Sequence, residues 1–312
     1  MVVVSTRMAQ QRVVAIFLVS IFCIIYNLRN FHAAESRFDS DRASTRSRNA
    51  KSMAKDISTF SSDREGCVSV TIPIDTFVPI FVLVRDRLMS LRTSLDSYRS
   101  AIKTPYEIII LDHHSSYPPM LTFLEELSQN STEVHSLKSW DWRSALNEAA
   151  NIIHMYLEKR PDAQYYVFTD PDIALLRNHP DVLLFYAALL ESCSVYQVVG
   201  PHLQISDIPI EYTTNSTSET ILEHESYFWT SAIPHMGTWN GAGQHFSDAA
   251  IDTTFAMRRR NLRFARLQSP SARVHAPYAA VHTDWYHNST NIPQDKIWYK
   301  THLNANRKVN HW

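Results

Sequence analysis

A short apolar stretch that ends in two carboxylates constrains this chain more than any other feature. Residues 164–176 read QYYVFTDPDIALL, and the aromatic and β-branched residues before Asp170 predict a buried strand. Asp170 and Asp172 follow at its carboxyl end, which is the edge where open α/β sheets bind ligands. Two hard oxygen ligands there suit a Mg²⁺ or Mn²⁺ ion that holds a diphosphate. The alternative is a local turn, in which Pro171 sets the backbone angle and the carboxylates cap a helix.

Composition narrows how such a ligand could be held. The 312 residues carry a formal net charge of −1, so the chain lacks the basic excess that marks nucleic-acid-binding proteins. Only 5 residues are glycine, and neither of the common Gly-rich phosphate-binding loops is present. A bound nucleotide would therefore be held by a metal ion and by side chains.

The N-terminal region predicts a membrane anchor. Residues 13–26 are uncharged and mostly Val, Ile, Leu and Phe, with Arg12 before them and Arg29 after them. This run is shorter than the ~20 residues of an ordinary membrane span, and a cleaved signal peptide or a buried helix would also be apolar. A short signal anchor fits best, because thin early-secretory membranes accept short spans and the preceding basic residues stay in the cytosol. We therefore expect a single-pass protein of the Golgi or endoplasmic reticulum membrane with a luminal globular part.

The composition changes twice after this run. Up to about residue 65 the chain is rich in Ser, Arg, Asp and Ala and shows little apolar periodicity, which is typical of segments that do not fold. The predicted regions are a cytosolic tail at 1–12, an anchor at 13–28, a flexible stem at 29–66 and a luminal domain at 67–312.

Two further features agree with a luminal domain without showing it. Acceptor sequons for N-glycosylation begin at Asn130, Asn215 and Asn288. Cys67 and Cys193 could form a disulfide in an oxidising compartment, or they could remain two free thiols.

From residue 67 onward the apolar periodicity alternates between strand and helix. Strands are predicted at 79–84, at 107–111 and up to Asp170, and helices at 88–98, 121–127, 145–157 and 180–190. This β-α-β-α-α-β-α order is typical of a mostly parallel sheet flanked by helices. We predict one α/β domain, in which the half after Gly200 contributes short strands.

Four segments in this order resemble the GT-A glycosyltransferases that are grouped near family 2. They are VPIFVLVRDR at 78–87, EIIILDHHSSYPPM at 107–120, the strand with its Asp-x-Asp motif at 165–175, and the pair AIDTTFAMRRR at 250–260 with APYAAVHTDWY at 276–286. His113 departs from the family, which usually has Asn after the Asp that closes the second strand. The resemblance implies a GT-A-like, Rossmann-type fold and transfer of a sugar from a nucleotide-sugar donor to a glycan or protein acceptor.

The resemblance also implies a metal site. Asp170 and Asp172 would bind Mn²⁺ or Mg²⁺, with Asp172 as the direct ligand and Asp170 nearer the donor ribose or acting through water. His282 resembles the histidine that completes the metal or diphosphate site in some GT-A enzymes; the alternative is an ordinary hydrogen-bonded histidine, of which a chain with 15 His has many.

Three more residues are predicted to bind the donor. Asp112 would contact the nucleobase or ribose, as the resemblance implies, and its alternative role is a cap for the Ser-containing loop that follows. Arg85 and Arg87 could contact phosphate or base, since guanidinium groups form bidentate contacts, or they could be solvated loop charges.

Asp252 is the predicted general base, which would take the acceptor proton in an inverting displacement. It opens a helical pattern through Phe255 and Ala256, where Asp is also favoured as an N-cap. Glu225 is the second candidate base. Two other functions would use the same residues, namely a catalytically silent nucleotide- or glycan-binding protein and a metal-dependent diphosphate hydrolase.

Overall fold

The computed structural model describes residues 57–175, 179–209, 221–230, 232–287 and 290–302. All of them belong to the unit Lys55–Trp312.

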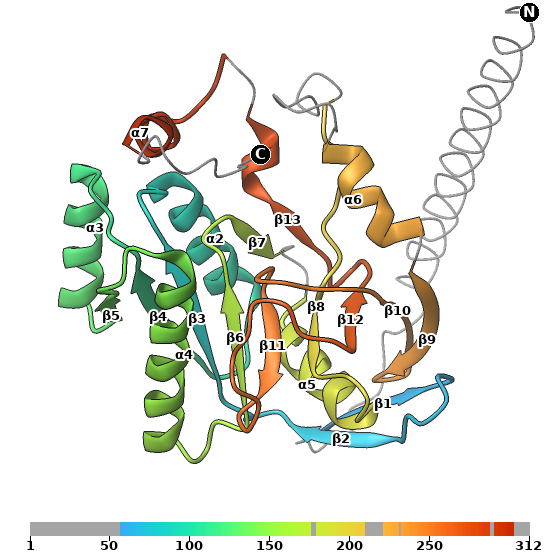
Figure 1. Ribbon diagram of the computed structural model, residues 1–312. Helices are drawn as coiled ribbons and strands as arrows, with labels where there is room; N and C mark the ends of the chain where they lie inside the picture. Colours follow the sequence, from blue (N-terminus) through green and yellow to red (C-terminus); the bar gives the residue numbers. More distant parts are fainter. Residues whose placement is uncertain (1–56, 176–178, 210–220, 231, 288–289, 303–312) are drawn as a thin grey trace, which may run out of the picture. The chain divides into compact units, whose positions relative to one another are not determined.

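Four parallel strands form one end of the main sheet, in the order β6-β3-β4-β5 (Figure 1). Helices α2, α3 and α4 connect successive strands of this group. The bounds are β3 Val78–Val84, α2 Leu88–Ala101, β4 Tyr106–Asp112, α3 Pro118–Gln129, β5 Glu133–Ser136, α4 Trp142–Lys159 and β6 Tyr165–Thr169. The strands and helices predicted from periodicity in this region are confirmed, and β5 is an additional short strand.

The remaining strands are mainly antiparallel. Strand β11 runs antiparallel between β6 and β8, β12 is parallel to β8, and β10, β9, β1 and β2 follow with antiparallel pairing. The bounds are β1 Ile57–Ser62, β2 Val70–Pro73, α5 Val182–Ser192, β8 Val198–Pro201, α6 Ile221–Thr230, β9 Ile233–Trp239, β10 Ala242–Asp248, β11 Ala256–Arg259 and β12 Ser271–Val274. A separate two-stranded sheet pairs β7 (Ile173–Leu175) with β13 (Ala280–His282), which leads into the 3₁₀ helix η3 (Thr283–Tyr286) and then α7 (Gln294–His302).

The α/β class is thus confirmed, but the sheet as a whole is mixed rather than mostly parallel. The predicted parallel pairing is found where a helix connects one strand to the next, because such a crossover returns the chain in the same direction. In the second half the β9–β10 connection is a two-residue hairpin turn, Asn240-Gly241, with φ of 50° and 88°. Such a turn reverses the chain and makes the two strands antiparallel.

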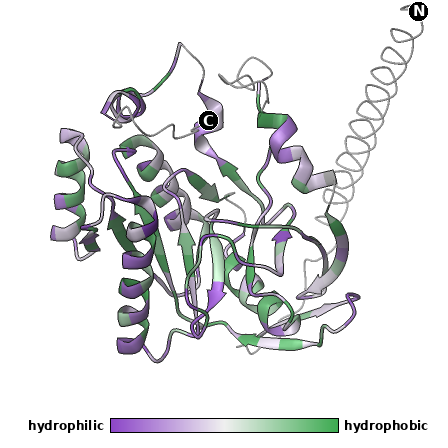
Figure 2. Ribbon diagram, in the orientation of Figure 1, coloured by the Kyte–Doolittle hydropathy of each residue, from purple (hydrophilic) through white to green (hydrophobic). Residues whose placement is uncertain are grey.

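Hydrophobic residues cover both faces of the parallel strands. Ile80 and Val82 of β3 pack in the cluster that contains α2, α3 and α5, whereas Phe81 and Leu83 pack in the cluster that contains α4. Alternate residues of a strand point to opposite faces, so the wholly buried run VPIFVLV is what a strand covered on both sides requires. Figure 2 shows hydrophobic residues along these strands and many hydrophilic residues on α4.

A run of three arginines at the end of β11 ties this strand to its surroundings. Arg258 is fully buried and donates to backbone carbonyls of the 252–265 segment. Arg259 contacts the carbonyl oxygen of Leu190 in the last turn of α5, and Arg260 donates to that of Leu157 in the last turn of α4 (2.8 Å). Helix C-termini have carbonyls without intrahelical partners. The arginines therefore contact the ends of two helices and fix β11 between them.

The prediction of a single-pass Golgi or endoplasmic reticulum membrane protein is corrected at this point. Among the helices of the described residues, none has the length and apolar character needed to cross a membrane. The predicted tail and anchor, at 1–12 and 13–28, lie outside the described residues.

The folded region also begins earlier than the predicted stem boundary at residue 66. Strand β1 (Ile57–Ser62) lies inside that stem and pairs with both β2 and β9. Phe60 is fully buried and packs edge-on against Phe185 of α5. One aromatic residue in a polar stretch gives too little periodicity to predict this strand.

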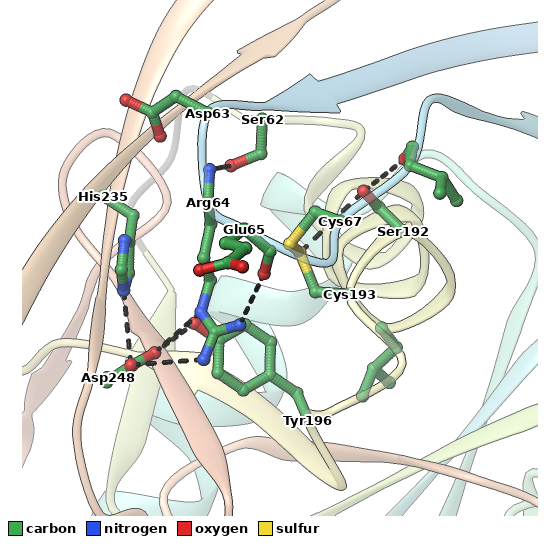
Figure 3. Close-up of a disulfide and its surroundings, with 12 residues drawn as sticks. Ser62, Asp63, Arg64, Glu65, Cys67, Ser192, Cys193, Tyr196, His235 and Asp248 are labelled. Carbon is green, nitrogen blue, oxygen red and sulfur yellow. Dashed lines mark hydrogen bonds and ion pairs between the residues drawn. A yellow bond between two sulfur atoms is a disulfide. The ribbon is translucent and has the colours of Figure 1, made fainter.

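A disulfide joins Cys67 to Cys193, at the end of α5 (Figure 3). It sits beside hydrogen bonds between Val68 and Ser192 and close to the ion pair between Arg64 and Asp248 (3.2 Å). These contacts connect the segment after β1 with α5 and β10. The alternative of two free thiols does not hold.

Loss of this disulfide should destabilise the folded protein without changing the site. The bond closes a loop of 126 residues, and constraining an unfolded chain over such a length is worth about 2–5 kcal/mol. Chemical denaturation of Cys67→Ser, Cys193→Ser and the double variant should give the same loss of unfolding free energy. Reduced wild-type protein should match them. Equal stability of the oxidised and reduced wild type would contradict the prediction.

Candidate active site

The predicted site residues gather at the carboxyl ends of β3, β4 and β6. There the chain forms a cavity of about 920 Å³, lined by residues that follow these strands and by residues of the second half of the chain. All of the predicted site residues except Asp112 line it, namely Arg85, Arg87, Asp170, Asp172, Glu225, Asp252 and His282. Because β3, β4 and β6 are parallel, their carboxyl ends share one edge, and this brings distant residues together.

Asp170 is held by the turn that precedes β11. Its backbone N–H donates to the carbonyl oxygen of Thr253 (2.9 Å), and the Thr253 hydroxyl donates to its carboxylate. The N–H of Phe255 donates to the hydroxyl of Thr169 (3.1 Å), and Phe255 itself has a left-handed φ of 48°. The predicted helix after Asp252 is therefore wrong. The residues form a tight turn and then β11, because pairing with β6 overrides a short helical pattern.

Gly200 of β8 permits this turn to approach. A Cβ atom at that position would collide with the side chain of Ile251 and lie 3.2 Å from the carbonyl oxygen of Thr254. A side chain at this position would require the Ile251 side chain to move and would crowd the turn that carries Asp252.

The carboxylates of Asp170, Asp172 and Asp252 lie close enough to interact. Burial raises the pKa of Asp170 well above its usual range, and the negative charges of Asp172 and Asp252 raise it further. Clustering of like charges in a buried place is unfavourable unless a cation or a proton compensates. The arrangement is thus suited to a positively charged ligand.

Asp172 lies between two side chains from different parts of the chain. Its Oδ2 is 3.9 Å from Nη2 of Arg87 and 3.6 Å from Nε2 of His282. His282 reaches this place because β13 pairs with β7, which sets it opposite Ile173, and its ring stacks on Trp285. Burial lowers the pKa of His282, so the neutral imidazole is favoured.

A divalent ion fits these residues only in part. The described residues contain no group of three or more His, Cys, Asp and Glu side chains that could hold a metal ion. Asp172 Oδ1 and His282 Nδ1 are nevertheless buried and lack a hydrogen-bond partner among the described residues. Mg²⁺ and similar ions commonly take one or two protein carboxylates and complete their shell with phosphate and water oxygens. Asp172, with Asp170 and His282 nearby, matches that pattern.

The two predicted donor-binding arginines differ in their surroundings. Arg87 is buried, forms an ion pair with Asp284 and is near the hydroxyl of Ser90 (3.5 Å). Arg85 lies with its guanidinium 5.4 Å from the ring centroid of Trp140. His113, which stands where the family usually has Asn, also lines the cavity, and its Nε2 is 3.0 Å from the carbonyl oxygen of Ser139.

Asp112 makes the contact expected of its alternative role as a cap, and its predicted contact with the nucleobase or ribose stays a prediction. Its Oδ1 accepts from the N–H of Ser115 (3.1 Å), and it does not line the cavity. The neighbouring residue Asp86, which the sequence did not single out, supports the same loop. It has a left-handed φ of 55° and accepts from the N–H groups of Ser116 and Tyr117. Asp tolerates this conformation better than most residues, and this is the only sequence signal that could have indicated Asp86.

Glu225 of α6 faces Arg273 of β12 across a buried ion pair of 2.7 Å. Arg273 also donates to the carbonyl oxygen of Ala250 (2.8 Å), so it joins α6 to the segment that carries Asp252. Its guanidinium lies 4.2 Å from the ring centroid of Phe228. Burial raises the pKa of Glu225 to about 7 despite the opposing effect of Arg273. Glu225 is thus paired with Arg273. Asp252 accepts a hydrogen bond from Thr254 Oγ1 (3.3 Å), which is longer than the 2.7 Å contact between Glu225 and Arg273.

No protein-family model and no curated protein sequence matches the chain. Among solved structures, it is similar to a mannosyltransferase of Pyrobaculum calidifontis in complex with GDP-Man and Mn²⁺, at 17% identity and a TM-score of 0.31, covering 42% of this chain and 36% of that one. It is also similar to S. aureus TarS 1–349 (12% identity, TM-score 0.38, 67% and 62% covered). A third is glucosyl-3-phosphoglycerate synthase of Mycobacterium tuberculosis (15% identity, TM-score 0.28, 43% and 46% covered). The chain spans less than two thirds of each, and at these scores the likeness assigns neither family nor activity.

Glu225 should make the stability of the protein depend on pH. Because its pKa is raised from 4.5 to about 7 on folding, the folded state keeps a proton that the unfolded chain has lost. The stabilisation of the folded state by this proton is complete below pH 4.5. It declines as the pH rises to 7, by at most about 3 kcal/mol. Urea unfolding of wild type between pH 5 and 7 should show this decline, and Glu225→Gln should reduce it.

The matched control is Glu126→Gln, at an exposed position on α3. It should keep the wild-type decline. The same slope in the Glu225→Gln variant would show that Glu225 is not the titrating group.

Proposed function

We propose that this protein transfers a sugar from a nucleotide-sugar donor to a hydroxyl group of a glycan or protein acceptor, with the aid of Mn²⁺ or Mg²⁺. One observation carries the proposal: three carboxylates, Asp170, Asp172 and Asp252, line a single cavity at the carboxyl edge of parallel strands. Arg85 and Arg87 lie at the same edge. Anionic and cationic groups in one place suit a ligand that brings both a metal ion and a diphosphate.

On the donor side, Asp172 would hold the metal ion with Asp170 and His282 close by. The ion, when bound, supplies positive charge that stabilises the departing diphosphate. Arg87 would add a second positive charge, since its guanidinium lies beside Asp172 at 3.9 Å. Arg85 would contact the nucleotide on the Trp140 side of the cavity, where His113 replaces the Asn that usually contacts the base.

On the acceptor side, Asp252 would accept the proton of the attacking hydroxyl. It directly precedes Thr253, whose carbonyl oxygen and hydroxyl hold Asp170, so the same turn would position the base and one of the carboxylates of the donor side. A carboxylate placed to take this proton supports direct displacement with inversion at the anomeric carbon. Glu225 is less suited to this role because Arg273 occupies it.

Asp172→Asn should abolish turnover. Nucleotide release from a panel of UDP- and GDP-sugars with Mn²⁺ should fall by at least ~10²-fold, because the diphosphate loses the carboxylate that places its counter-charge. Added EDTA should have the same effect on wild type. Asp96→Asn, an exposed position on α2 with a side chain 74% accessible, is the control and should leave the rate unchanged. Wild-type release that survives EDTA would contradict metal dependence.

Asp252→Asn should separate binding from chemistry. Affinity for UDP or GDP should stay within about twofold of wild type, while transfer to an acceptor should fall by ~10²–10⁴-fold, the range of general-base contributions. NMR of the product should show inverted anomeric configuration, and a retained configuration would exclude this role for Asp252. Diphosphate hydrolysis without acceptor that persists in the variant would favour the hydrolase instead.

A further inference from the structure

The first turn of α7 contains two charged residues that are almost completely buried. Asp295 is 2% exposed and Lys296 is 5% exposed, although both lie in a short helix near the C-terminal end of the described residues. Charged side chains are rarely buried to this extent unless they are paired. Their partners therefore indicate what the helix does.

Lys296 is paired with Asp284 of η3. Its Nζ lies 3.1 Å from Asp284 Oδ2 and 3.3 Å from the Asp284 carbonyl oxygen. Asp284 also forms an ion pair with Arg87 and accepts a hydrogen bond from the hydroxyl of Ser90 (2.9 Å). One carboxylate is therefore shared by two cations and a hydroxyl.

The presence of Lys296 on the same carboxylate sets the net charge of the cluster that faces a ligand. If Arg87 were the sole cation on Asp284, the two would neutralise each other. With Lys296 on the same carboxylate, the three groups keep a net positive charge. Arg87 lies at the cavity wall next to Asp172, and its Nε has no hydrogen-bond partner within the described part of the chain.

Helix α7 is itself anchored to the segments that follow β3 and β4. Asp295 accepts from the N–H of Met89 (2.6 Å) at the start of α2, a helix whose N-cap residue makes no side-chain capping bond. The indole N–H of Trp298 donates to the hydroxyl of Ser116 (3.1 Å), in the loop after β4. These contacts hold Lys296 in place against the segments that follow β3 and β4.

We propose that Lys296 is a positioning residue, which acts through Asp284 to keep the Arg87 guanidinium in place and charged toward the diphosphate of the donor. This inference rests on the proposed function, because it assumes that a nucleoside diphosphate binds beside Arg87. Lys296 does not line the cavity and does not touch the ligand; its effect passes through the shared carboxylate.

The test measures binding of UDP and GDP by calorimetry in the presence of Mn²⁺. Lys296→Met should weaken the nucleoside diphosphate that binds wild type by about tenfold, the effect of losing one charge-assisted contact. Binding of the corresponding nucleoside, which lacks phosphate, should be unchanged. Lys296→Arg should restore most of the affinity. Arg87→Gln should weaken the diphosphate at least as much, and the double variant should be no weaker than Arg87→Gln, because residues that act through one contact are not additive.

Lys300→Met is the matched control, since it removes a lysine from an exposed position on the same helix. It should bind like wild type. Lys296→Gln gives the same comparison if the Met variant does not fold. Unchanged diphosphate affinity, additive effects with Arg87→Gln, or an equal loss of nucleoside binding would each overturn the inference. Failure of wild type to bind either nucleotide would instead reject the proposed function on which it rests.

Discussion

The antiparallel pairing of β11 with β6 is the contact on which the rest of the site depends. It sets Ala256 opposite Phe168, so the turn before β11 meets the residues that follow β6. Asp170 is then bound through both its backbone and its carboxylate to Thr253, and Asp252 stands next to it. A shift of β11 by one residue would exchange the two faces of the strand. The arginines at the end of the strand oppose such a shift, because Arg259 and Arg260 are fixed to the ends of two different helices.

Electrostatics explains why a structure would keep such a cavity. Burial and like charges raise the pKa of Asp170, which means that the carboxylate cluster costs stability in the absence of a cation. Unfavourable groups of this kind persist where function requires them. Elsewhere in the same cavity wall, the buried charges are compensated: Glu225 by Arg273, and Asp284 by Arg87 with Lys296. The uncompensated negative charge is concentrated at the end of β6.

The sequence predicted the first half of the fold well, because its strands and helices are long and each repeats its own apolar period. It also located Asp170 and Asp172, since a pair of carboxylates directly after a buried strand is typical of a ligand-binding sheet edge. The short strands expected after Gly200 are present, but the sequence did not place them: β8, β11 and β12 have four residues each, too few for a period to appear, and the turn after Asp252 was mistaken for a helix. Asp284 was missed because its partner Arg87 is about 200 residues away, and Lys296 was missed because its role depends on that same Asp284 carboxylate; such pairings leave no local pattern.

The two ion-pair systems of the cavity differ in a way that orients a ligand. Arg273 and Glu225 form a closed pair, with the guanidinium also on the Phe228 ring and the Ala250 carbonyl. That wall therefore offers little net charge, together with an aromatic surface on which a neutral ring can pack. Around Asp172, by contrast, Arg87 Nε and Asp172 Oδ1 have no partner among the described residues. A ligand that combines an anionic group, a metal ion and a neutral ring is accommodated best with the anion and the ion near Asp172 and Arg87 and with the neutral ring near α6. In a nucleoside diphosphate sugar the negative charge lies on the diphosphate, between the nucleoside and the neutral sugar. In the proposed reaction the sugar would extend from Asp172 toward α6, and Asp252 would lie beside the bond between the sugar and the diphosphate.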